Sequence, residues 1–360
     1  MDNKKSCGII TFHEAVNYGA VLQAYALKKV ISRYCDVHFV RHSNPAILNR
    51  NSISPGFPKS IASLKRFIIK SLTYLPNRKK HNYFAQFRDR YLLDTPEKHA
   101  DFYITGSDQV WNDKCTDFDK AYFLDFTDDK KKNSYSASFG FDSVPEDKVD
   151  EYRRLLSGFN NISVREKTGK DIISDLIERD VRVTLDPTLL LSKEEWSELV
   201  RPVDSYGKYL LVYAFEITDK MAEFANKIAE ERNLRVLILL PEKSLWKKSP
   251  IKNAKFVNYV SPEEWVSFFY HADFIVTNSF HGTVFSINFN KQFAVELLPP
   301  PSKVNSRLTD VLDMFELNTR YISSSDIRKS IGFERCNSIM QAKREESVSY
   351  LKSIIEGYNE

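Results

Sequence analysis

The chain has 360 residues, of which 42% are hydrophobic and 28% charged, an ordinary composition for a globular protein. Its 52 basic and 48 acidic side chains give a formal net charge of +4, and so mild an excess argues against a nucleic-acid partner. A chain of this length exceeds one comfortable hydrophobic core, so two domains are predicted.

The first part of the chain is predicted to form a strand over residues 7–12, a helix over 20–31 and a strand over 35–40. No signal peptide fits before the first strand, and no apolar run approaches transmembrane length, so we expect a cytoplasmic protein. Gly19 stands alone, without the GxGxxG pattern of a dinucleotide site. The loop before the helix is either a plain turn or a binding site for a polar ligand. In the second case the contacts would come from Asn17, Tyr18, Gly19 and Gln23.

Residues 59–90 form a basic segment that carries nine Lys and Arg side chains and a single acid, Asp89. Apolar residues at positions 61, 64, 67, 68 and 72 lie on one face of a predicted helix. A basic amphipathic helix can rest on an anionic membrane, so peripheral contact with the inner face of the membrane is one interpretation. The other is an ordinary helix whose charged face is solvated.

Residues 101–112 repeat the opening pattern, with an apolar strand, Gly106 and then a polar cluster. Donors, acceptors and an aromatic plate in one short turn suit the hydroxyls and the ring face of a sugar. Alternatively, the polar side chains cap a helix and the tryptophan belongs to the core. The cluster consists of Ser107, Asp108, Gln109, Trp111 and Asn112.

Two further strands are predicted over residues 132–139 and 161–166. Arg165, at the end of the second strand, is a candidate anion clamp because its planar fork matches a carboxylate or a phosphate. The alternative is a structural ion pair between Arg165 and Glu166. The Asp-Pro-Thr phrase at 186–188 interrupts the pattern, and we place a hinge between domains near it.

The second half of the chain again alternates strands and helices. Strands are predicted over 209–215, 235–240, 274–276 and 292–298, and helices over 218–232, 262–272, 308–317 and 336–358. This pattern predicts an α/β protein with two Rossmann-like domains whose parallel sheets face a central cleft. The expected domains are residues 1–188 and 189–335, with the helix of 336–360 closing the structure and packing back on the first.

The strand over 274–276 leads into a small polar turn and then into a helical spacing of apolar residues. Open α/β proteins bind ligands at such junctions, and the helix N-terminus favours an anion there. His281 lies in this turn beside Gly282, which would let a substrate approach the backbone. The alternative is a histidine that only caps the helix. The predicted donor-side contacts are Asn278, Ser279, Gly282 and Thr283, with Lys303 and Arg307 from a nearby polar loop.

Six short phrases occur in order along roughly residues 7–320 of the chain. They are NYGAVLQAY at 17–25, GSDQVWN at 106–112, SFG at 138–140, SVRE at 163–166, DPT at 186–188 and TNSFHGT at 277–283. Together they closely resemble the polysaccharide pyruvyl transferases. The resemblance implies a GT-B-like architecture and transfer of a pyruvyl group from phosphoenolpyruvate to two hydroxyls of a sugar. The products would be a cyclic ketal and phosphate.

The resemblance places the family's catalytic histidine on His281 and its donor-side arginine on Arg165. Relatives often carry Arg two positions before the histidine, where this chain has Ser279, so Arg307 or Lys303 would have to supply that cation. Protonation of the methylene carbon of phosphoenolpyruvate needs an acid, which we assign to His281, and the sugar hydroxyl needs a base, which we assign to Asp108.

Because no hydride moves in this reaction, neither an organic cofactor nor a metal is expected, and phosphoenolpyruvate is the donor substrate. The acceptor would be a sugar or a lipid-linked oligosaccharide, bound on the N-terminal side by the residues named above and by Glu166. Two alternatives remain open. One is a glycosyltransferase that uses a sugar nucleotide in the same two-domain frame, and the other is a non-catalytic glycan-binding relative.

Overall fold

The computed structural model describes residues 4–53, 64, 67–68, 71–72, 74–93, 99–240, 249–298 and 305–358. In the N-terminal half, a parallel sheet has the strand order β2-β1-β3-β4, and β5 pairs with β6 beside it. Two isolated bridges, Asn133–Asn161 and Ala137–Val164, link the two. The strands are β1 Ser6–Ile10, β2 Asp36–Phe39, β3 Phe102–Thr105, β4 Lys132–Ser134, β5 Ser163–Val164 and β6 Arg182–Val183.

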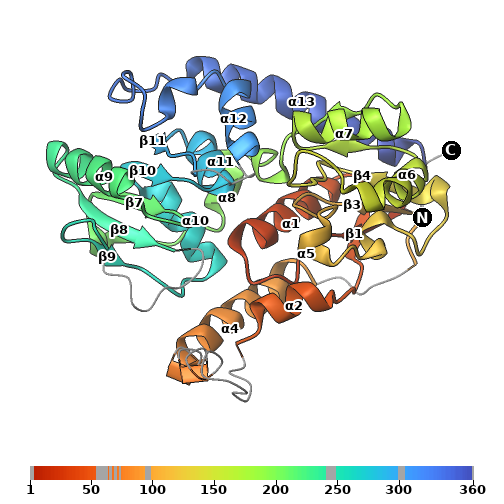
Figure 1. The fold of residues 1–360 in the computed structure, drawn as a ribbon, viewed down its shortest axis with the longest axis horizontal. Coiled ribbons are helices and arrows are strands. Elements are labelled where there is room, and N and C mark those ends of the chain that lie inside the picture. Colours follow the sequence, from red (N-terminus) through yellow and green to blue (C-terminus); the bar gives the residue numbers. More distant parts are fainter. Residues whose placement is uncertain are drawn as a thin grey trace.

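Helices surround this sheet (Figure 1). They are α1 Tyr18–Ile31, α2 Pro45–Asn51, α4 Tyr74–Tyr91, α5 Asp113–Thr116, α6 Val149–Ser157 and α7 Lys167–Ile177. Short 3-10 turns are η1 Lys120–Phe123, η2 Asp129–Lys131, η3 Glu146–Lys148 and η4 Pro187–Leu189.

The C-terminal half contains a second parallel sheet, in the order β11-β10-β7-β8-β9. Its strands are β7 Tyr209–Tyr213, β8 Arg235–Leu239, β9 Lys255–Phe256, β10 Phe274–Thr277 and β11 Gln292–Val295. Its helices and turns are α8 Lys193–Ser197, η5 Asp204–Tyr206, α9 Asp219–Glu231, α10 Pro262–His271, α11 Phe280–Asn288, α12 Asn305–Met314 and η6 Asn318–Arg320. Every residue of β7 and β10 is buried, as expected for parallel strands covered on both faces.

The predicted elements agree with the structure where apolar periodicity is strong, as in α1, α9, β7 and β10. Several strands are shorter than predicted, two of them by at least four residues. The strand expected over 132–139 ends at Ser134, because Ser136 adopts a φ of 54°, a left-handed conformation that ends regular strand pairing. The strand expected over 161–166 is reduced to Ser163–Val164.

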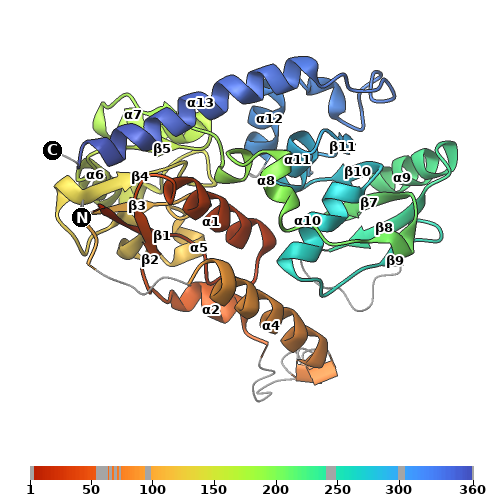
Figure 2. The ribbon, with the colours of Figure 1, turned by 180° about the vertical axis from the view of Figure 1, so that it is seen from behind.

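The last helix, α13 Glu334–Glu356, runs along both halves of the molecule (Figures 1 and 2). At the middle of this helix, Arg344 donates to Asn288 of α11 at 2.6 Å. Further along, the Ser347 hydroxyl accepts from the Leu185 amide at 3.1 Å, and the Tyr350 hydroxyl donates to the carbonyl of Ser134 at 3.1 Å. The helix therefore ties the C-terminal half to the N-terminal sheet.

The two halves also pack directly against each other through α1 and α10. The Tyr18 ring stacks on Trp265 at 5.8 Å, and its hydroxyl donates to the carbonyl of Val260 at 2.9 Å. Two parallel sheets that meet in this way, with a helix returning to the first, confirm the predicted GT-B-like architecture. Among the described helices, none combines the length and the apolarity needed to cross a bilayer.

Candidate functional site

His281 lies in the first turn of α11, directly after β10. Ser279 caps this helix, with its hydroxyl accepting from the Gly282 amide at 3.4 Å. The His281 side chain is only 13% exposed. Its Nε2 atom is buried, has no hydrogen-bond partner among the described residues, and lies 4.0 Å from Oδ2 of Asp186. This nitrogen is thus left without a hydrogen bond within the described parts of the chain, although it lies next to a carboxylate.

Gly19, in the first turn of α1, packs directly against the His281 ring. A Cβ atom at position 19 would lie 2.1 Å from Nδ1 of His281, far inside any real contact distance. The absence of a side chain at Gly19 therefore lets the N-terminal half approach the histidine of the C-terminal half. Through this contact the helices that follow β1 and β10 meet at one point.

Asp186 is the central residue of the site. From the sequence it is predicted only as part of a hinge between domains, not as a site residue. Its Oδ2 atom accepts from the Ser107 hydroxyl at 3.0 Å and from Nη1 of Arg165 at 3.1 Å. Its Oδ1 atom accepts from the amide and the hydroxyl of Thr188 at 2.9 and 2.6 Å. Burial alone would raise the pKa of Asp186, but the charges of His281 and Arg165 and the Thr188 bonds outweigh it and lower the pKa. The carboxylate is thus ionised beside His281.

Arg165 is buried between two carboxylates. Besides Asp186, its Nε atom donates to Oε2 of Glu166 at 3.3 Å, and the guanidinium lies 4.5 Å from the centre of the Phe280 ring. Burial opposes the charge, yet Glu166 and Asp186 leave the pKa of Arg165 raised. Its Nη2 atom, however, is buried with no hydrogen-bond partner in the described parts of the chain.

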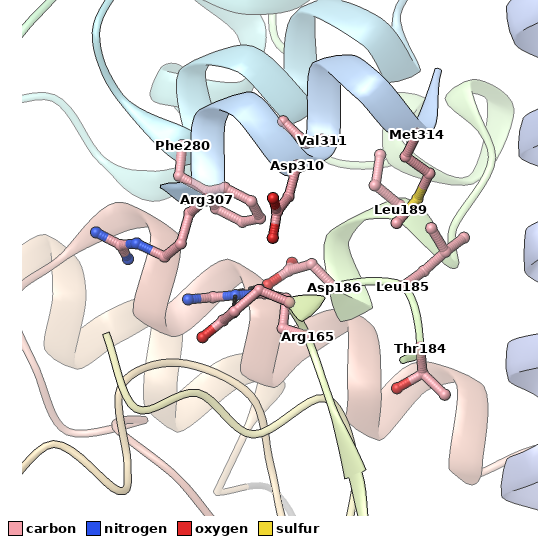
Figure 3. Close-up of a pocket in the computed structure, with 11 residues that line it drawn as sticks. Arg165, Thr184, Leu185, Asp186, Leu189, Phe280, Arg307, Asp310, Val311 and Met314 are labelled. Carbon is pink, nitrogen blue, oxygen red and sulfur yellow. Dashed lines mark hydrogen bonds and ion pairs between the residues drawn. The ribbon is translucent and has the colours of Figure 1, made fainter. Parts of the chain in front are cut away.

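Arg307 approaches Arg165 from α12. Figure 3 shows Arg307 and Asp310 reaching from this helix toward Arg165 and Asp186. The Nε atom of Arg307 is buried and, within the described ranges, has no partner. Burial lowers the pKa of Arg307, and the neighbouring charge of Arg165 lowers it further. Two guanidinium groups that repel each other favour an anion between them.

The pKa of His281 is lowered, first by burial. The charges of Asp186 and Asp108 act in the opposite direction, and those of Arg165 and Arg307 add to the lowering. The imidazole is therefore neutral near pH 7 in the absence of a ligand. An anion that neutralises the two arginines would shift this balance toward the protonated form.

A small cavity of about 20 Å³ lies beside these charged groups, between the two halves. Arg165 and Asp186 form part of its wall from the N-terminal half, and Phe280 and Arg307 from the C-terminal half. Among the described residues, no group of three His, Cys, Asp or Glu side chains is arranged to hold a metal ion.

Most polar side chains of the turn after β3 form hydrogen bonds within the protein. Asn112 caps α5 by accepting from the Lys114 amide at 3.0 Å, and its side chain donates to Gln109 at 3.0 Å. Ser107 is fully buried on Asp186. Asp108 is half-buried, with a φ of 80° and its carboxylate accepting from the Gln109 amide at 2.8 Å.

Trp111 has no exposed surface in this structure, and its indole donates to the carbonyl of Tyr122 at 3.2 Å. Its ring packs on Phe123, Phe139 and Phe159. The structure therefore supports the alternative interpretation of Trp111 as a core residue rather than an open platform for a sugar ring.

Most of the residues predicted to bind a ligand at the start of α1 have structural roles instead. Asn17 is exposed and caps α1 by accepting from the Ala20 amide at 3.2 Å. Tyr18 is buried at the contact between the halves. Gln23 is fully buried and donates to the Thr11 hydroxyl at 2.8 Å. Gly19 is buried against His281, which leaves Asn17 as the exposed residue of the four.

The remaining predicted residues of the C-terminal turn mainly support it. Asn278 is buried, accepting from the Phe215 amide and donating to the carbonyl of Glu216, both at 2.8 Å. The Thr283 hydroxyl donates to the carbonyl of Ser279 at 3.0 Å. A Cβ at Gly282 would lie 2.3 Å from Oγ1 of Thr277, so this glycine packs on β10 and does not leave room for a substrate. Glu166 is buried between Ser138 and Arg165, and Lys303 lies outside the described residues.

A comparison with known protein families shows to which family the chain belongs. The model of the family described as "Polysaccharide pyruvyl transferase" matches residues 17–295, most of the chain, and includes both halves of the site. The chain belongs to the polysaccharide pyruvyl transferase family. Membership in this family makes the protein a transferase of polysaccharide biosynthesis, and it confirms the resemblance predicted from the six phrases.

Solved structures with a similar overall shape are sugar enzymes of low sequence identity. UDP-GlcNAc 2-epimerase from Methanocaldococcus jannaschii is 12% identical, with a TM-score of 0.46 over 93% of this chain and 92% of that chain. A UDP-glucosyltransferase from Polygonum tinctorium is 12% identical, with a TM-score of 0.43 over 99% of both chains. A search of curated proteins found no match. For this pyruvyl transferase family member, such distant likeness says nothing about the substrate.

Proposed function

We propose that this protein transfers the pyruvyl group of phosphoenolpyruvate to two hydroxyls of a sugar, in a polysaccharide or its precursor, and releases phosphate. The observation that carries the proposal is the pair of mutually repelling guanidiniums, Arg165 and Arg307, beside His281. Each of the three side chains has a buried nitrogen without a partner among the described residues. Phosphoenolpyruvate carries a carboxylate and a phosphate, so it can accept hydrogen bonds from both arginines at once.

Binding of this anion also prepares the acid. The two arginines lower the pKa of His281, and an anion bound between them cancels that effect, while Asp186 and Asp108 still raise it. The pKa of His281 would then rise with the substrate bound, which favours the protonated form beside the methylene carbon that must receive the proton. A proton donor whose pKa lies near the working pH transfers its proton most effectively.

The reaction then has two additions at C2 of phosphoenolpyruvate. In the first, a sugar oxygen bonds to C2, its proton goes to Asp108, and the methylene carbon takes a proton from His281 to become a methyl group. In the second, the neighbouring hydroxyl bonds to C2, the C2–O bond to phosphate breaks, and phosphate leaves with the second proton. The guanidiniums stabilise the departing phosphate. The sequence of steps needs no oxidant, organic cofactor or metal.

We place the acceptor on the N-terminal side of the site, where Asn17, Asp108 and Gln109 are at least partly exposed. Asp108 is close enough that its charge raises the pKa of His281, as a base and an acid acting on one substrate require. The acceptor is a sugar or a lipid-linked oligosaccharide, and the reaction takes place in the cytoplasm at the inner face of the membrane.

The test is an incubation of the protein with phosphoenolpyruvate and a panel of free, nucleotide-linked and lipid-linked sugars. Phosphate release and a ketal product found by mass spectrometry would support the proposal. A stable complex with a sugar nucleotide, combined with no binding of phosphoenolpyruvate in a thermal-shift assay, would instead support the glycosyltransferase alternative. Binding of glycans without any phosphate release would support a non-catalytic role.

A further inference from the structure

An exposed apolar stripe precedes and begins α4. Leu64, Ile68, Leu72 and Leu75 are 45, 49, 62 and 72% exposed, and all four are helical. Leu64, Ile68 and Leu72 recur every four residues, the spacing of one helical face, and Leu75 follows in the first turn of α4. Tyr74, also exposed, lies beside them at the start of α4. The remaining large exposed hydrophobic side chains of the described surface are far apart in sequence and on different elements: Leu48, Phe126, Phe215 and Phe256. We call residues 64, 67–68, 71–72 and 74–79 the arm.

The arm is held away from both sheets. In Figures 1 and 2, α4 (orange) extends outward from the N-terminal half, and its first turns form the far end of the molecule on that side. The other end of α4 is firmly packed. Phe84 and Phe87 are buried, and their rings lie 5.0 Å from Tyr18 and 5.9 Å from Tyr25 of α1. The stripe therefore projects from a rigid base.

The charge of this region is of one sign. From residue 59 to residue 88 the sequence contains no acidic side chain, and Arg78 and Lys79, at the end of the stripe, are exposed. Leucines that insert below the headgroups, next to cations that meet lipid phosphates, are the features of a helix lying in an anionic membrane interface. A protein partner would need an acidic surface with an apolar groove that matches the helix, whereas a lipid bilayer needs no matching shape.

The base of α4 also connects the arm to the site. Arg88 donates from Nη1 to the carbonyl of Glu14 at 3.2 Å, in the loop that leads to α1, and Gly19 of α1 contacts His281. We propose that the arm docks on an anionic lipid bilayer and thereby presents the N-terminal side of the site to an acceptor anchored in that bilayer. Only the identity of the acceptor rests on the proposed function.

Vesicle co-sedimentation of the full chain tests the docking. We expect binding to vesicles of phosphatidylglycerol and phosphatidylcholine, weaker binding at high salt, and little binding to phosphatidylcholine alone. The double variant Leu72→Asp with Leu75→Asp should lose sedimentation. Replacing Arg78 and Lys79 by Gln should weaken binding roughly fivefold for each charge removed. Phe256→Asp, a matched change of an exposed apolar residue on β9, should bind like the unaltered protein.

Several results would overturn the proposal. These are no binding to anionic vesicles, binding that the two Asp substitutions leave unchanged, or a dimer in light scattering that these substitutions convert to a monomer. The last result would show that the stripe covers a second copy of the chain. Because phosphate release with a soluble acceptor needs no membrane, the arm variants should retain it, and the docking and the proposed reaction can fail independently.

Discussion

Two histidines occupy corresponding places in the two halves of the molecule. His13 follows β1 and His281 follows β10, each at the carboxyl end of a parallel sheet. Burial is the main cause that lowers the pKa of both, for His13 to about 4. His13 packs on Phe39 with ring centres 4.6 Å apart, and the charges of Arg88 and His42 lower its pKa further.

His281 differs in its charged neighbours. Asp186 and Asp108 oppose the effect of burial, and Arg165 and Arg307 can be neutralised by an anion. In the reaction that we propose, these charged neighbours would let His281 act as a proton donor, and His13 lacks them. Without them it remains a neutral core residue.

Replacement of His281 by Ala should have the largest effect. Loss of a general acid typically reduces a rate by about 10²–10⁴-fold, so phosphate release should fall by this factor while the protein stays folded. His13→Gln, the matched change at the other sheet, should retain activity. Equal losses in the two variants would remove the distinction between the histidines.

Acid should destabilise the protein partly through His13. Its pKa is about 4 in the folded protein, and an unfolded histidine titrates near 6.5. Between these values the unfolded state binds a proton that the folded state does not, so the free energy of unfolding falls as the pH decreases from about 6.5 to about 4. The full effect is about 3 kcal/mol. Urea unfolding at several pH values should show a shallower slope for His13→Gln, and an unchanged slope would contradict the assignment.

Gly19→Ala should impair catalysis more than stability. The added methyl group would overlap the His281 ring, which must then move. A displacement of about 1 Å in a catalytic group can cost about 10²-fold in rate. The control is Gly357→Ala, whose new Cβ would meet only ordinary contacts of 3.5 Å. Activity assays with parallel thermal melts distinguish the two effects, and full activity of Gly19→Ala would show that the histidine need not be held there.

Arg307→Gln should weaken donor binding without disrupting the site. Unlike Arg165, Arg307 forms no ion pair with any of the described residues, so its removal leaves no carboxylate buried alone. Loss of one charged hydrogen bond to the substrate should raise the KM for phosphoenolpyruvate about tenfold. Arg335→Gln, which breaks a surface pair with Glu316, should leave KM unchanged. An unaltered KM in Arg307→Gln would exclude this arginine from the donor site.

The two polar turns show where sequence reasoning succeeded and where it stopped. Both follow a buried strand, and both contain donors and acceptors. In the turn after β10, the imidazole of His281 lies next to the carboxylate of Asp186, whereas the turn after β3 uses Asn112 as a cap and Trp111 in the core. Their compositions do not differ in any way that distinguishes a binding turn from a capping turn.

The sequence by itself determined the local elements, the α/β class and the family, because apolar periodicity and short ordered phrases are properties of neighbouring residues. Only the tertiary structure decided that Asp186 joins Arg165 and His281, and that Gly19 must lack a side chain. These contacts link residues up to hundreds of positions apart. They depend on how two sheets and a returning helix pack, which no local pattern records.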